Sequence, residues 1–98
     1  MPVAALTLEI RIEHAQSLKD RRQVVRSLKE KLQNGFNISV SELDKAVTWQ
    51  SATIGIAAIS NSRDYLAGQM KQVEDAAVRI ANDLGAQVED AWWNFLEE

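Results

Sequence analysis

The chain has 98 residues, 46% of them hydrophobic, and a formal net charge of −3, which argues against generic nucleic-acid binding. This length suits one compact domain, so we expect a single domain over residues 1–98. The absence of cysteine excludes disulfides and thiolate metal sites, and no run is apolar enough for a leader or a membrane span, so we expect a cytoplasmic protein.

The first half of the chain predicts a strand followed by a helix. Apolar and polar residues alternate over residues 3–13, which is the two-residue period of a half-buried strand. Ser17 and Asp20 form a near capping box, so a helix is expected over residues 17–34. Gly35 is expected to end it in the left-handed conformation.

The second half predicts two strands, a helix and a last strand. Apolar and polar residues alternate over residues 36–41, which predicts a strand. A β-rich run follows from Trp49 to Ile59; this run is apolar on both sides, which is typical of a central strand. A second helix is expected from Asn61 or Ser62 to residue 84, with Gly85 after it. Residues 86–98 alternate well enough to form a fourth strand.

This β-α-β-β-α-β order predicts a ferredoxin-like α+β fold, with both helices on one face of a four-stranded antiparallel sheet. The apolar positions that face the helices are expected to make the core: Leu8, Ile10, Val25, Leu28, Ile54, Ile56, Val73 and Ile80.

The residues lack the patterns of common functional classes. The open-face positions of the first and third strands have no aromatics to stack RNA bases. The loop after the first strand has no glycine or arginine to hold phosphate, and His14 is the only histidine. We therefore predict a non-enzymatic protein with no catalytic residue, no cofactor and no metal.

The helix over residues 17–34 holds six of the eleven Lys and Arg residues. Lys19, Arg22, Arg26 and Lys29 follow a 3-4-3 spacing and form a stripe beside the apolar face. Such a stripe either contacts consecutive phosphates or is a solvated surface paired with Asp20 and Glu30. Residues 1–49 carry eight Lys and Arg against six Asp and Glu, whereas residues 50–98 carry three against eight. The acidic second half of another copy of the chain is therefore a further expected partner for the stripe.

Three other side chains stand out. Arg21 projects toward the apolar side of its helix, where it either extends past the helix start or pairs with an acidic group at the helix start. Trp92 and Trp93 must face opposite sides of the last strand, so one of them points outward. They either fill the core and the sheet edge or form a self-association patch, for which we single out Trp93 and Phe95.

The chain resembles the bacterial YlxP-like family of unknown function. Three stretches carry the resemblance: residues 15–22 with Val25 and Ser27-Leu28, residues 36–42, and Trp49 with Ile54-Gly55. Asp20 and Arg21 stand where a Glu-Lys pair is common in the family. The resemblance implies a ferredoxin-like fold, brings no catalytic residues, and hints at ribosome-related work because family members are often encoded beside translation factors.

Two functions follow as expectations. The first is an accessory protein that docks Lys19, Arg22, Arg26 and Lys29 onto ribosomal RNA, a ribosomal subunit or an acidic protein surface. The second is a homodimer or larger homo-oligomer that uses the sheet face or the Trp93 region, with no membrane partner in either case. A small enzyme or metabolite sensor would need a polar pocket around His14, Asp20 and Arg21.

Overall fold

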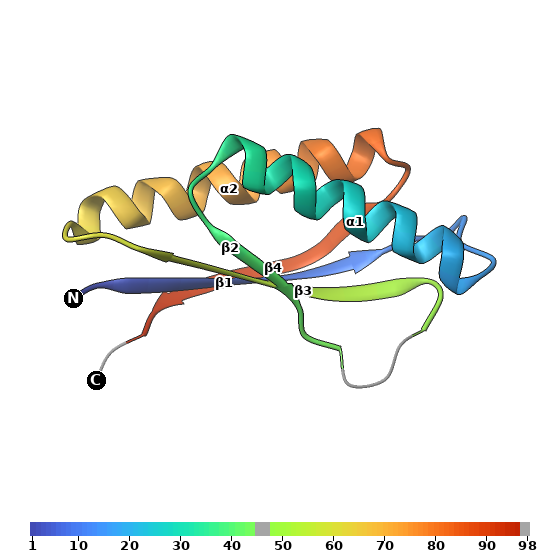
Figure 1. Cartoon of the computed structure of the whole chain (residues 1–98), viewed down its shortest axis with the longest axis horizontal. Helices are drawn as coiled ribbons and strands as arrows, with labels where there is room; N and C mark the ends of the chain where they lie inside the picture. Colours follow the sequence, from blue (N-terminus) through green and yellow to red (C-terminus); the bar gives the residue numbers. More distant parts are fainter. Residues whose placement is uncertain (45–47, 97–98) are drawn as a thin grey trace.

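A computed structural model describes residues 1–44 and 48–96. Two helices cover one face of a four-stranded sheet whose order is β2-β3-β1-β4, with every neighbouring pair antiparallel (Figure 1). The elements are β1 (Val3–Arg11), α1 (Leu18–Gly35), β2 (Ser39–Glu42), β3 (Ser51–Ile59), α2 (Arg63–Asp83) and β4 (Gln87–Phe95). The predicted ferredoxin-like fold is confirmed.

The alternating pattern of β1 sets the two faces of the sheet. Leu6 and Leu8 are fully buried under the helices, while Thr7 between them lies on the opposite face, which we call the open face. β1 and β3 pair along their whole length, from Val3 with Ile59 to Arg11 with Ser51. As predicted, β3 is an interior strand, between β1 and β2.

β4 keeps its apolar residues on the helix side by means of a bulge. Trp93 pairs with Leu6, but the register shifts between Glu9 and Ile10, so that Ile10 pairs with Val88. The extra residue returns Val88 to the helix side, where a regular strand would have turned it outward.

The predicted starts of the helices are confirmed. The Ser17 hydroxyl accepts the Asp20 amide N–H at 3.1 Å, and Ser62 does the same for Tyr65. Asp20 completes the first cap by accepting the Gln16 N–H, not that of Ser17.

The predicted end of α1 was wrong. Gly35 belongs to the helix and does not have a positive φ; the helix ends because Phe36 adopts an extended conformation while its N–H still bonds to the Leu32 carbonyl. Gly85 has the left-handed φ of 79° that was expected for Gly35. β2 begins only at Ser39, because Phe36 and Ile38 pack against the core as part of the connection.

The core lies between the helices and the sheet. Of the predicted core residues, all are buried except Ile80, which packs against the core while partly exposed. Neither helix in the described part of the chain is long and apolar enough to cross a bilayer.

Leu28 tests this packing, because it is 1% exposed on the inner face of α1. We expect Leu28→Ala to lower the free energy of unfolding by about 2–5 kcal/mol, as other buried leucines do. Urea denaturation followed by circular dichroism measures the loss, with Gln23→Ala on the exposed face as the control. Equal effects of the two substitutions would contradict the packing described here.

Candidate functional site

Arg21 fastens the start of α1 to the sheet. Its side chain is buried and each of its nitrogens donates a hydrogen bond: Nε to the Ser51 carbonyl at 2.9 Å, Nη1 to Glu42 at 3.0 Å and Nη2 to Asp44 at 2.9 Å. Asp44 also accepts the Thr53 backbone N–H at 2.9 Å. One guanidinium therefore joins α1 to β3 and to the segment after β2.

The sequence left two roles open for Arg21, and the structure selects the ion pair. The carboxylates come from residues 21 and 23 positions later in the chain, not from the helix start. Three of the five guanidinium N–H groups therefore have acceptors within the protein.

The predicted basic stripe lies on the solvent side of α1. Lys19, Arg22 and Arg26 are exposed, and Lys29 is half-buried. A shallow depression of about 440 Å³ is lined by Lys19, Arg22, Gln23, Arg26 and Ser27. The structure thus brings three of the four predicted cations around one depression, and Lys29 follows at the next turn.

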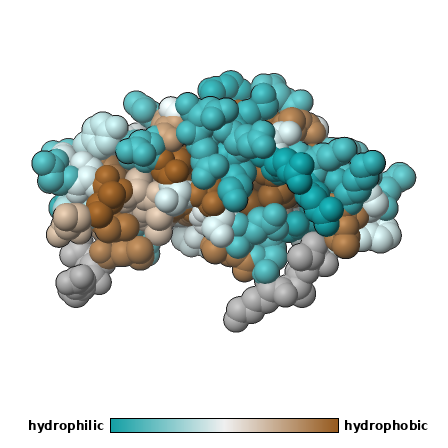
Figure 2. Space-filling view, viewed as in Figure 1, coloured by the Kyte–Doolittle hydropathy of each residue, from teal (hydrophilic) through white to brown (hydrophobic). Residues whose placement is uncertain are grey.

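These four cations have no acidic partner in residues 1–44 and 48–96. Asp20, which the sequence offered as a partner, caps the Gln16 N–H instead. Elsewhere on the surface, Lys71 pairs with Asp75 at 3.4 Å. Figure 2 shows that hydrophilic residues cover the surface over α1. The stripe is therefore a group of like charges that is left to attract an anion.

The aromatic residues of β4 divide between the two faces. Trp93 and Phe95, which were singled out for self-association, pack against the core and meet edge to face with ring centroids 5.2 Å apart. The Arg63 guanidinium lies 4.0 Å from the centre of the Phe95 ring. Trp92 is the outward tryptophan and is 47% exposed on the open face.

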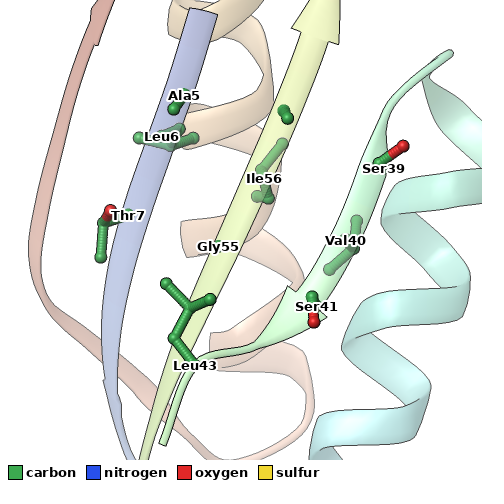
Figure 3. Close-up of a pocket in the computed structure, with 10 residues that line it drawn as sticks. Ala5, Leu6, Thr7, Ser39, Val40, Ser41, Leu43, Gly55 and Ile56 are labelled. Carbon is green, nitrogen blue, oxygen red and sulfur yellow. The ribbon is translucent and has the colours of Figure 1, made fainter. Parts of the chain in front are cut away.

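The open face carries a hollow that the sequence analysis did not identify. It measures about 290 Å³ and is lined by small side chains of β1, β2 and β3, together with Leu43 (Figure 3). A Cβ atom on Gly55 would lie 2.8 Å from Leu43 Cδ1, so Leu43 would have to shift if any other residue stood at position 55. A glycine inside an apolar strand was the available signal of this close approach.

Metal ligands do not gather in the described part of the chain. No group of three or more His, Cys, Asp or Glu residues there is placed to hold an ion. The His14 ring lies against Gly85, where a Cβ atom would be 3.4 Å from His14 Cε1.

Comparison with known proteins identifies the family. The family model described as "Protein of unknown function (DUF503)" matches residues 3–91, and the chain belongs to this family. It is 40% identical over 62 residues to the uncharacterized protein YlxP of Bacillus subtilis (strain 168), a match that covers 63% of this chain and 67% of that protein. The predicted YlxP-like resemblance is confirmed.

Two solved structures share the fold at low identity. One is the Bacillus subtilis YXEP protein, a dinuclear metal-binding peptidase of the M20 family, with 16% identity and a TM-score of 0.62; the match covers 96% of this chain but only 25% of that one. The other is a dimeric ferredoxin-like protein of unknown function from Thermobifida fusca, with 15% identity, a TM-score of 0.53 and coverage of 100% and 92%. These likenesses extend to the fold alone.

The Arg21 ion cluster predicts an asymmetric result of substitution. Arg21→Met leaves Asp44, whose side chain is 14% exposed, without its cation. We expect a loss of about 2–4 kcal/mol in the free energy of unfolding, because Glu42 still reaches water but Asp44 hardly does.

The double variant Arg21→Met, Asp44→Asn should recover part of that loss, because it removes the uncompensated charge. Arg22→Met, on the exposed neighbour, should change stability by no more than about 0.5 kcal/mol. Additive losses at positions 21 and 44 in urea denaturation would contradict the ion cluster.

Proposed function

We propose that this member of the DUF503 family is a non-enzymatic accessory protein that docks the basic stripe of α1 onto ribosomal RNA. The observation that carries the proposal is the set of cations around one depression, because Lys19, Arg22 and Arg26 form no ion pair with any carboxylate of residues 1–44 and 48–96. A phosphate in that depression would supply the missing charge.

A rigid helix favours this use of the stripe. Arg21 holds the first turn of α1 to the sheet, and Val25, Leu28 and Leu32 bury its inner face. The cations are thus presented on a preorganised support, so less freedom is lost on binding than with a flexible basic tail.

The remaining charge of the protein orients the contact. α2 carries four Asp and Glu against three Lys and Arg, and β4 carries two Asp and Glu and no Lys or Arg, whereas α1 carries six Lys and Arg against two Asp and Glu. Phosphate is therefore attracted to α1 more than to α2 or β4. Because the stripe has no aromatic residue among its cations, the expected contacts are with the RNA backbone and not with bases.

The ribosomal partner is proposed from the family resemblance, because members of the YlxP-like family are often encoded beside translation factors. If the protein binds as a monomer, the alternative partner is an acidic protein surface, which the same cations would attract. RNA is the better match for a linear stripe, because phosphates repeat regularly along a strand.

Co-sedimentation with ribosomal subunits over a salt series tests the proposal. Four phosphate contacts predict that log K falls with log salt concentration with a slope of about −3. The variant Arg22→Glu, Arg26→Glu, Lys29→Glu should lose binding by at least about tenfold at low salt.

The matched control is Lys31→Glu, Lys71→Glu, Arg79→Glu, which changes the net charge equally at exposed positions outside the stripe. It should retain most of the binding. Equal losses in both triple variants, or no binding of the wild type at any salt concentration, would contradict docking through the stripe. Binding that survives ribonuclease treatment would identify a protein surface instead.

A further inference from the structure

The open face divides into an uncharged half and a charged half. The strand register aligns Trp92, Thr7, Gly55 and Ser41 in one row across the sheet, and Asn94, Ala5, Ala57 and Ser39 in the next. None of these side chains is charged. On the other side of the Thr7 row, the charged half begins with Glu9, which pairs in register with Asp90.

The uncharged half has a protruding group on one side and a hollow on the other. Trp92 stands on β4 at one edge and is 47% exposed. The hollow lies toward β2 at the opposite edge, where Leu43 lies beside Gly55 and forms its wall (Figure 3). Leu43 is itself 51% exposed, so both Trp92 and the Leu43 wall of the hollow leave apolar surface in water.

We propose that a second copy of this chain covers the open face, related by a two-fold axis parallel to the strands. This rotation reverses the strand order but keeps the level along each strand, so β4 of one copy faces β2 of the other, and β1 faces β3. Each Trp92 then enters the hollow of the other copy, and the contact is isologous.

The small residues at the centre allow the two sheets to approach. Thr7 of one copy meets the Leu43 side chain that covers Gly55 of the other, and Ala5 meets Ala57. Two sheets pack aligned in this way when their inner faces carry side chains that fit together, about 10 Å apart. The large side chains over these rows are Trp92 and Leu43, and Leu43 forms the wall of the hollow that lies opposite Trp92.

The distribution of charge selects this axis over the perpendicular one. A two-fold axis across the strands at the level of Thr7 would reverse the levels, so the Glu9 row of each copy would lie on the Ala5 row of the other. That arrangement would bury carboxylates against alanines, at a high desolvation cost. With the parallel axis, charged rows face charged rows at the rim, where sheet twist separates them and water reaches them.

The proposal is independent of RNA docking. The helices lie on the other face of the sheet (Figure 1), so two copies joined through their open faces would present both α1 helices outward. An experiment can therefore contradict RNA docking through α1 without contradicting dimerisation through the open face, and the reverse.

Sedimentation equilibrium tests the dimer and the role of Trp92. The wild type should show a reversible monomer–dimer equilibrium that strengthens or stays constant as salt is raised. Trp92→Ala should weaken dimerisation by about tenfold or more, as loss of a central aromatic anchor does. Trp49→Ala is the matched control, because Trp49 is 53% exposed two residues before β3 and outside both rows, and it should leave dimerisation unchanged. A wild type that stays monomeric, or a Trp92→Ala protein that dimerises as well as the wild type, would overturn the proposal.

Chemical cross-linking tests the axis without altering Trp92. The natural chain has no cysteine, so each new thiol is unique. With the parallel axis, Asn94 of one copy faces Ser39 of the other across the gap of about 10 Å between the sheets, while identical positions are also displaced sideways by three strand spacings, about 14 Å. This gap is too wide for a direct disulfide. A short bis-maleimide should therefore join Ser39→Cys to Asn94→Cys in a mixture of the two proteins, and it should not join either protein to itself. No cross-linked dimer in the mixture, or equal dimer from a single variant, would overturn this geometry.

Discussion

The burial of Arg21 is the constraint on which the arrangement of surfaces depends. A guanidinium removed from water needs acceptors for its charge and its N–H groups, and they come from the Ser51 carbonyl, Glu42 and Asp44. This requirement fixes the rotation of α1 about its own axis. Since successive helical residues turn by about 100°, an inward Arg21 places Arg22 and Lys19 toward solvent. The same contact that secures the helix therefore sets the direction of the basic stripe.

The two surfaces occupy opposite layers of the domain and depend on different forces. The stripe of α1 acts through charge, so added salt weakens its contacts. The open face would bind through the burial of apolar surface and through complementary shape, and added salt leaves such contacts unchanged or strengthens them. The sheet separates them, because Leu6 and Leu8 turn toward the helices while Ala5 and Thr7, which alternate with them, turn toward the open face. A single alternating strand thus supports the core on one side and a contact surface on the other.

Much of this architecture was predictable from local pattern, and the failures have physical causes. The two-residue period of β1 and the Ser17 cap depend on neighbours in sequence, and both were predicted correctly. Gly35 was misassigned because a glycine permits a left-handed turn without requiring one. The partners of Arg21 lie more than twenty residues away, so no local pattern names them. The hollow depends on the placement of Leu43 against Gly55, which only the tertiary structure specifies.

The most direct test of the central claim, that a fixed α1 presents its cations to RNA phosphate, is an NMR titration of the labelled protein with a single-stranded RNA oligonucleotide. The account predicts shift changes concentrated on residues 19–29, with the amides of the open face unmoved, and their reversal by added salt. Shift changes centred on β1 and β3, or none at a saturating concentration of RNA, would contradict it.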